Sequence, residues 1–309
     1  MPLPSTTDRQ VPPAGKLVFA DEAAAALIGP ALAMLCDPAG AGWERVKDNG
    51  SRAVFRGRIG SREVYVKHYR RRSLLRTILQ RLGLADAQRE MKFSEYLRRH
   101  GVPTARALAA MTGPVEWLCT EAVADAQGLD QWHVVTLAGG PAGARDISQA
   151  TVRLAEMVGR MHACGVIHCD LHGGNILVRQ KDGTIDLVLM DLHRMARRRR
   201  LSRRAMSANL AQLFHDRAHF TTRTQRLRFL KHYLRTSGAS GSLRGWHLMV
   251  EHFAHAHGKR QYANRDRRIA GDDRYFTRVQ LPGGWRGLAV LRSKHCLGGS
   301  QAARLIFTR

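Results

Sequence analysis

Hydrophobic and polar residues alternate over residues 43–69, on either side of a turn at Gly60-Ser61. Alternation with a period of two is typical of half-buried strands, and a glycine turn between two such runs indicates a β-hairpin. Helical spacing follows over 84–97, and the segments 105–110 and 115–120 are strand-like. We therefore predict a small antiparallel sheet accompanied by one helix.

The pattern becomes helical after Glu121. Residues 146–165 contain apolar side chains at the spacing of an amphipathic helix. The apolar side of this helix carries Val152, Ala155, Val158 and Met161. Further helical patterns cover the segments 210–220, 225–234 and 246–257. We expect these segments to form a second lobe that is mainly helical.

The stretch GVIHCDLHGGNILV, residues 165–178, places polar residues between two aliphatic runs. We expect its second run, 176–178, to pair with 187–190 across a turn at Lys181-Asp182-Gly183, which makes a second hairpin. The polar residues then occupy a loop that is held between a helix and a strand.

These patterns predict an α+β fold with two lobes and a hinge near residues 121–130. A short helix is expected at 22–36, and the strand-like segments YFTRVQL and RGLAVL lie near the C-terminus. The chain divides into a flexible N-terminal tail at 1–16, an N-lobe at 17–121, a helical C-lobe at 122–257 and a C-terminal extension at 258–309.

The chain is strongly basic, with 50 lysine and arginine residues against 25 aspartate and glutamate residues, a formal charge of +25 and a pI near 11.2. A charge of this size creates an electrostatic field that attracts polyanions such as nucleic acid, anionic lipid and phosphorylated glycans. The alternative interpretation is an arginine-rich surface that is simply solvated. The five cysteines are scattered without a CxxC pair, which argues against a disulfide framework or a zinc site. Without a secretory pattern or an apolar run of about 18 residues, we expect a soluble intracellular protein.

The order of polar residues along the chain matches the needs of phosphoryl transfer. This chemistry requires a lysine for the nucleotide phosphates, an acid that fixes the lysine, oxygen ligands for Mg²⁺ and a carboxylate that faces the acceptor hydroxyl. Lys67 lies on the second strand of the first predicted hairpin. Glu90, on the following helix, is its expected ion-pair partner, with Glu95 as the alternative.

The polar loop supplies the carboxylate and amide groups. Asp170 precedes Asn175 by five positions, a spacing that directs the carboxylate at an incoming hydroxyl while the amide oxygen binds a metal. Asp191 ends the second hairpin, where its carboxylate is placed to bind Mg²⁺, an ion that prefers hard oxygen ligands. His168 and His172, without a third ligand nearby, are expected to pack the loop rather than to bind zinc.

Taken in order, VYVKHY, HCDLHGGN and LMDLHR resemble motifs of the protein-kinase-like superfamily, and within it those of the lipopolysaccharide kinase family of heptose and Kdo kinases. The resemblance covers roughly residues 43–235 and implies a bilobal protein-kinase-like fold, with a small antiparallel-sheet N-lobe, a larger helical C-lobe and ATP between them. The resemblance implies that Asp170 is the catalytic base and that Asn175 and Asp191 are the metal ligands. It also implies that Lys67 binds the phosphates, that Glu90 is the ion-pair partner of Lys67, and that His168 has a structural role.

The chain departs from the usual kinase pattern at three places. The loop Asp48–Arg52, which would cover the phosphates, has no GxGxxG, so Gly50 is the one glycine available there. The sequence Asp191-Leu192-His193 replaces DFG but keeps the metal-binding carboxylate. His172 stands where protein kinases usually carry lysine, a form that is similar to kinases of sugars and other small molecules.

The resemblance implies an ATP- and Mg²⁺-dependent kinase that phosphorylates a heptose or Kdo hydroxyl of the lipopolysaccharide inner core. The expected partners are ATP and an anionic glycolipid, with peripheral contact to the anionic inner membrane on its cytoplasmic face and no specific nucleic acid. Two arginine clusters have two possible roles: the seven arginines of Arg194–Arg204 and the earlier arginines at 70–72, 76 and 81. They either bind phosphates of the acceptor or of the membrane, or they belong to solvated loops.

Two other functions agree with parts of the sequence. One is a kinase of another small molecule, such as an aminoglycoside, or of a protein; the +25 charge favours an anionic acceptor over a cationic one. The other is a basic pseudokinase that binds nucleic acid or membrane. The complete set of lysine, aspartates and asparagine argues against it, and no nucleic-acid-binding motif accompanies the charge.

Overall fold

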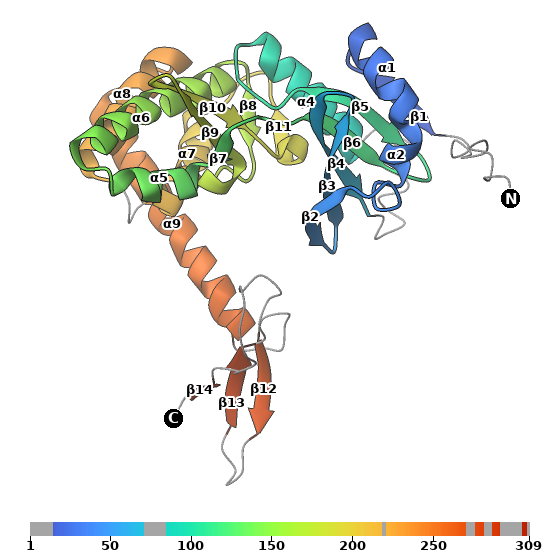
Figure 1. Ribbon diagram of the computed structural model, residues 1–309. Helices are drawn as coiled ribbons and strands as arrows, with labels where there is room; N and C mark the ends of the chain where they lie inside the picture. Colours follow the sequence, from blue (N-terminus) through green and yellow to red (C-terminus); the bar gives the residue numbers. More distant parts are fainter. Residues whose placement is uncertain are drawn as a thin grey trace, which may run out of the picture.

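The computed structural model describes residues 15–70, 85–217 and 221–269, together with short strands at 276–280, 286–290 and 305–307. Figure 1 shows a lobe built around a sheet and a second lobe built mainly from helices. The last long helix extends outward from the helical lobe and leads to the C-terminal strands. This arrangement confirms the predicted α+β class with two lobes.

The N-lobe contains a six-stranded antiparallel sheet of order β1-β5-β6-β4-β3-β2. The predicted turn at Gly60-Ser61 is confirmed between β3 and β4, with Ile59 paired to Arg62 and a positive φ of 58° at Gly60, which suits glycine. The range 43–69, predicted as two strands, contains a third strand, β2, that pairs with β3. The strands are β1 (Lys16–Phe19), β2 (Glu44–Asn49), β3 (Arg52–Ile59), β4 (Arg62–Tyr69), β5 (Ala107–Thr112) and β6 (Trp117–Glu121).

Helices cover both faces of this sheet. One face packs against α1 (Glu22–Ile28) and α2 (Leu32–Cys36), which the sequence predicts as a single helix. Pro30 has no amide hydrogen to donate within an α-helix, and the intervening residues form the 3₁₀ helix η1 (Gly29–Ala31). The other face packs against α4 (Asp86–Arg99), the helix predicted at 84–97.

Alternation along β4 decides where its lysine points. Val64 and Val66 belong to the core under α1 and α2, so the alternate residues Tyr65, Lys67 and Tyr69 face the opposite side. Tyr69 packs with α4, and Lys67 contacts a residue of α4 as well. The strand period therefore directs the predicted phosphate-binding lysine into the space between the sheet and α4.

The helical lobe is organised around α6 (Gly140–Ala163), which packs against α8 (Arg223–Ser237). Of the predicted apolar side of α6, Ala155, Val158 and Met161 are buried and Val152 is half-buried. The other helices of this lobe are α5 (Leu129–Leu137), α7 (Arg203–Arg217) and α9 (Leu243–Ile269).

Two small sheets flank the polar loop. The second predicted hairpin is confirmed as β9 (Ile176–Lys181) and β10 (Thr184–Leu189), and β7 (Ala126–Gly128) pairs with β9. In the other sheet β8 (Val166–His168) pairs with β11 (Met195–Arg197). The 3₁₀ helices η2 (Gly173–Asn175) and η3 (Leu192–Arg194) lie in the segments that connect these strands.

The C-terminal part differs in one respect from the prediction. Helix α9 runs to Ile269 instead of ending at 257, and so passes the boundary predicted at 258. The two predicted strands are confirmed as β12 (Phe276–Gln280) and β13 (Arg286–Val290), and β14 (Leu305–Phe307) pairs with β13. The division of the chain into domains remains a prediction.

Two compositional expectations concern thiols and membrane spans. Across the described ranges, the four cysteines present are free thiols. Within the same ranges no helix has both the length and the apolar character needed to cross a membrane.

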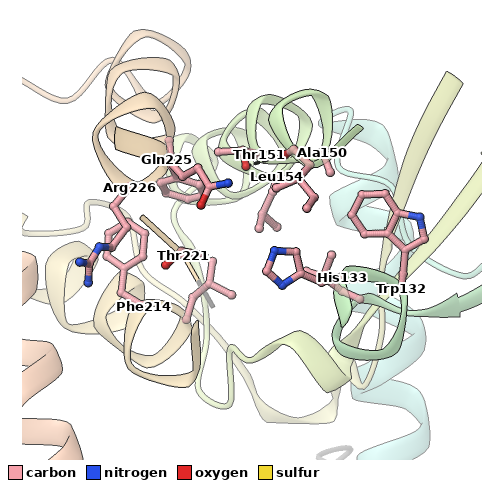
Figure 2. A pocket seen from close by; sticks show the side chains of 13 residues that line it. Trp132, His133, Ala150, Thr151, Leu154, Phe214, Thr221, Gln225 and Arg226 are labelled. Atoms are coloured by element: carbon pink, nitrogen blue, oxygen red, sulfur yellow. Dashed lines mark hydrogen bonds between the residues drawn. The ribbon is translucent and has the colours of Figure 1, made fainter. Parts of the chain in front are cut away.

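A pocket of about 60 Å³ lies among α5, α6, α7 and α8 (Figure 2). Apolar side chains such as Trp132, Leu154 and Phe214 line most of it, and His133 and Gln225 add polar groups. None of the residues predicted to bind nucleotide or metal is among its lining residues. The candidate site therefore lies elsewhere in the molecule.

His162, near the end of α6, is expected to make stability depend on pH. Its Nδ1 lies 2.8 Å from the hydroxyl of Tyr233 and its Nε2 lies 3.0 Å from Oδ1 of Asn209, so the neutral ring satisfies both partners. Burial lowers the pKa of His162 to about 4, against the opposing hydrogen bond with Asn209. Because the unfolded chain takes up a proton near pH 6.5, the free energy of unfolding should fall by about 3 kcal/mol as the pH drops from 6.5 to 4.

Denaturant titrations between pH 7 and 4 measure this effect. The variant His162→Gln should lose less free energy of unfolding than the wild type over that range. His100→Gln, at an exposed histidine, should lose as much as the wild type. Equal losses in the wild type and His162→Gln would contradict the prediction.

Candidate active site

The polar loop begins at Gly165, in the turn between α6 and β8. Its φ is +79°, and a Cβ atom there would lie 2.2 Å from the carbonyl oxygen of Arg198, so glycine is required at this close approach. The backbone N–H of Arg198 donates to the carbonyl of Gly165 at 2.8 Å. This contact extends the β8–β11 pairing up to the start of the loop.

His168 fixes the loop from inside. It is fully buried; its Nδ1 accepts from the backbone N–H of Asp170 at 3.1 Å, and its Nε2 lies 3.1 Å from the carbonyl oxygen of Met190. Asn209 on α7 donates to the carbonyl of His168 at 2.7 Å. Burial lowers the pKa of His168, so the neutral ring links the loop to the residue that precedes Asp191.

The carboxylate of Asp170 projects from this loop, with 42% of the side chain exposed. Arg194 donates to its Oδ2 at 3.2 Å. The buried amide nitrogen of Asn175 donates to the carbonyl of Asp170 at 2.9 Å and lies 3.0 Å from Nε2 of His172. Because these contacts occupy the amide nitrogen, the amide oxygen of Asn175 is the atom suited to bind a metal.

Asp191 follows β10 in the left-handed conformation, with a φ of 62°, which is uncommon for residues other than glycine. The backbone N–H of Met190 donates to the carbonyl of Asn175 at 2.8 Å, which ties the two predicted metal ligands together through the backbone. His193 Nδ1 lies 2.7 Å from Asp191 Oδ1, and two nitrogens of Arg52 donate to the carboxylate at 2.6 Å each. Burial alone would raise the pKa of Asp191, but these hydrogen bonds outweigh it and hold that pKa well below its usual range.

Lys67 and Glu90 form a buried ion pair between β4 and α4. Nζ of Lys67 also lies 3.9 Å from Oδ1 of Asp191, so the lysine approaches the carboxylate across the two lobes. Glu95, the alternative partner, is exposed and pairs with Arg99 instead. The structure thus brings Lys67, Glu90 and Asp191 together and leaves Glu95 outside.

Two further donors hold the carboxylate of Glu90. The hydroxyl of Tyr69 donates to one of its oxygens, and the backbone N–H of Leu192 donates to the other at 3.3 Å. Burial, together with the charge of Glu90, raises the pKa of Tyr69, so the hydroxyl remains a donor. Glu90 therefore connects the sheet lobe directly to the residue that follows Asp191.

The loop between β2 and β3, which contains Gly50, is closed by the side chain of Asn49. Its Oδ1 accepts from the backbone N–H of Ser51 at 3.1 Å, from the hydroxyl of Ser51 at 2.9 Å and from the backbone N–H of Arg52 at 3.0 Å. In a glycine-rich loop such amides would be available to phosphates, but here two of them are used within the turn. A role for Gly50 in phosphate binding remains a prediction.

Arg52 and His193 are the contacts of Asp191 that sequence reasoning missed. Arg52 is separated from Asp191 by 139 positions. The sequence feature that could have indicated a role for Arg52 is its position two residues after Gly50, the lone glycine of the loop. His193 lies two positions after Asp191, where the departure from DFG was visible but its contact was not.

The donor set at this place fits a hard divalent cation. One ligand atom each from Glu90, Asp191 and His193 lies within 4.8 Å of the others. Glu90 is already paired with Lys67, so Asp191 and the amide oxygen of Asn175 are the oxygen ligands expected for Mg²⁺. Only Asp191 is common to this cluster and to the predicted ligand pair, and the site formed by Asn175 and Asp191 remains a prediction.

Room for a nucleotide is limited in this state. The cavity beside Lys67 and Asp191 measures about 10 Å³, enough for about one water molecule. Arg52 of the sheet lobe meanwhile bridges to Asp191 of the helical lobe. Arg52 therefore occupies the side of Asp191 that faces the sheet lobe.

A buried lysine–glutamate pair that faces a carboxylate across two lobes places this molecule among kinase-like proteins. The sequence matches the model of the lipopolysaccharide kinase (Kdo/WaaP) family over residues 45–233, more than half of the chain, and the chain belongs to this family. It is a kinase of the lipopolysaccharide pathway and hence a phosphotransferase, as the sequence motifs predicted.

A similar solved structure supports the same fold. The chain is similar to the solved structure described as WaaP in complex with acyl carrier protein, at 24% identity and a TM-score of 0.58, over 78% of this chain and 98% of that chain. A BubR1 kinase domain matches at 14% identity and a TM-score of 0.35, over 50% of this chain and 46% of that chain. Comparison with curated protein sequences found no match.

Proposed function

We propose that this protein uses ATP and Mg²⁺ to phosphorylate a hydroxyl group of heptose or Kdo in the lipopolysaccharide inner core. The observation that carries the proposal is the convergence of the Lys67–Glu90 ion pair on Asp191, beside the loop that joins Asp170 to Asn175. Each group has a defined task in phosphoryl transfer, and the chain belongs to a family of lipopolysaccharide kinases.

The roles follow from the contacts. Lys67, held by Glu90, would bind the phosphates of ATP, and Asp191 with the amide oxygen of Asn175 would hold Mg²⁺. The bound ion supplies positive charge that offsets the charge developing on the transferred group. Asp170, exposed beyond the metal ligands, would orient the sugar hydroxyl and accept its proton as the oxygen forms a bond to phosphorus.

Basic side chains beside Asp170 support an anionic acceptor. Arg194 contacts the carboxylate of Asp170, and Arg199 and Arg200 are exposed on the same basic run. Guanidinium groups bind phosphates through paired hydrogen bonds. We therefore propose a phosphorylated glycolipid as acceptor and a peripheral position at the anionic cytoplasmic face of the inner membrane.

Other parts of this basic run contact aromatic rings on α4 and α9. The guanidinium of Arg197 lies 4.2 Å from the ring centre of Tyr96, and that of Arg203 lies 5.1 Å from the ring of Trp246. Cation–π contacts of this kind hold the ends of the run in place. In the earlier cluster Arg70 pairs with Asp48 at 2.5 Å, and the arginines at 71, 72, 76 and 81 lie outside the described residues.

Phosphotransfer to purified, dephosphorylated core lipopolysaccharide tests the function. With γ-labelled ATP and Mg²⁺ the protein is expected to label this acceptor, and mass spectrometry of core fragments should assign the added phosphate to heptose or Kdo. Chelation of Mg²⁺ should abolish the label. Labelling of an aminoglycoside or of peptides, but not of lipopolysaccharide, would favour the other kinase; DNA binding without nucleotide turnover would favour a pseudokinase.

A further inference from the structure

A two-point contact across the two lobes is made by a residue that the kinase mechanism above does not use. Arg52 donates to both oxygens of Asp191 at 2.6 Å, and only 12% and 16% of the two side chains is exposed. A paired, largely desolvated guanidinium–carboxylate contact is among the strong hydrogen-bonding arrangements in proteins. Because the guanidinium occupies a lone pair on each oxygen of the predicted metal ligand and neutralises its charge, Arg52 competes with Mg²⁺ for Asp191.

The position of Arg52 in the sheet shows where the released guanidinium would lie. In the β3–β4 register Val54 is opposite Lys67 and Arg52 is opposite Tyr69. Opposed residues, and residues two apart on one strand, share a face of the sheet. Arg52 is thus the diagonal neighbour of Lys67 and stays on the side of the sheet that faces the nucleotide site.

The loop that precedes Arg52 has few groups of its own for phosphate. The side chain of Asn49 already accepts from the backbone N–H groups of Ser51 and Arg52. The hydroxyl of Ser51 donates to the same oxygen of Asn49, and Asp48 is a carboxylate that pairs with Arg70 at 2.5 Å. A planar guanidinium with several donors supplies the phosphate recognition that this turn does not offer through its backbone.

We propose that Arg52 is a phosphate-positioning residue that changes partner with the state of the site. It holds Asp191 when the site has no nucleotide, and it binds the phosphates of ATP when nucleotide and Mg²⁺ are present. In this way the carboxylate becomes more available to the metal when phosphates offer Arg52 a new partner. The proposal rests on the proposed kinase function and deepens its nucleotide site.

Calorimetric titration of the full chain with adenosine, ADP and ATP, with and without Mg²⁺, tests this role. The variant Arg52→Ala is expected to bind Mg²⁺-ATP about 10–100-fold more weakly than the wild type, because charged hydrogen bonds to phosphate are lost. Adenosine, which has no phosphate, should bind both proteins equally. Mg²⁺ alone should bind Arg52→Ala more tightly, because Asp191 is no longer occupied.

Two further variants complete the comparison. Arg52→Lys keeps the charge without the planar fork and should recover only part of the affinity for Mg²⁺-ATP. Arg58→Ala lies on the same strand and face but contacts the carbonyl of Ser61 at the far turn, so it should behave as the wild type.

The outcomes separate the two proposals. If Arg52→Ala binds Mg²⁺-ATP as tightly as the wild type or more tightly, Arg52 only caps Asp191 and its phosphate role is wrong. Equal losses for adenosine and ATP, without a gain in Mg²⁺ affinity, would mean that Arg52 is merely structural and would also overturn the proposal. A wild-type protein that binds no Mg²⁺-ATP would overturn the kinase function itself.

Discussion

Replacing Asp170 by alanine is expected to lower turnover by about 10²–10⁴-fold, with little change in the affinity for Mg²⁺-ATP. The loop should survive the change, because His168 and Asn175 contact the backbone of Asp170 and not its carboxylate. The lost group is the one that would orient the acceptor hydroxyl and take its proton. Single-turnover transfer from ATP to core lipopolysaccharide measures the rate.

Asp186→Ala is the matched control for this experiment. Asp186 is an exposed carboxylate on β10 that pairs with Arg179 at 2.8 Å, much as Asp170 pairs with Arg194 at 3.2 Å. The control should keep the wild-type rate. Full activity in Asp170→Ala would rule out Asp170 as the base, and equal losses in both variants would point to surface charge instead of proton transfer.

Replacing Lys67 by methionine is expected to lower both stability and activity. The free energy of unfolding should fall by about 3–5 kcal/mol, because the buried carboxylate of Glu90 loses its cationic partner. Turnover should fall by about 10²-fold or more, because a cation beside the transferred phosphates is lost. Denaturant titration and steady-state kinetics measure the two effects.

The double variant Lys67→Met/Glu90→Gln separates these effects. A neutral amide keeps one acceptor oxygen, which can replace the carboxylate toward either Tyr69 or Leu192 but not both, so part of the stability should return, whereas activity should not. Lys92→Met, at an exposed lysine on the same helix, should change neither quantity. Recovered activity in the double variant would show that Lys67 serves the fold and not the phosphates.

Local patterns were sufficient for the elements that carry the site. The alternation over 43–69 predicted β3 and β4 because a tight turn determines the register of a hairpin. The polar loop was placed correctly because aliphatic runs on both sides anchor it to β8 and β9. The prediction of one continuous helix at 22–36 was wrong, because Pro30 has no backbone N–H and lies in a 3₁₀ helix between α1 and α2.

The C-terminal end of α9 was missed for a physical reason. The last turns of α9 extend outward from the helical lobe (Figure 1), and side chains such as Lys259 and Arg260 are exposed. A helix segment that covers no core needs no apolar period, so the periodicity used for prediction stops where the packing stops.

The choice between Glu90 and Glu95 shows a similar limit within the site. Both lie on α4, and only the rotation of the helix on the sheet decides that Glu90 is buried beside Lys67 while Glu95 faces solvent. Periodicity predicts which residues share a face of a helix, but it does not determine which part of the protein that face contacts.

The linear pattern was enough to predict the two lobes and the order of a lysine, a carboxylate–amide loop and a final aspartate, because periodicity and turns are local properties. The contacts of Arg52 with Asp191 and of Arg194 with Asp170 became visible in the folded molecule. Contacts between distant segments depend on how the sheet and the helices pack, and short-range patterns do not encode that geometry.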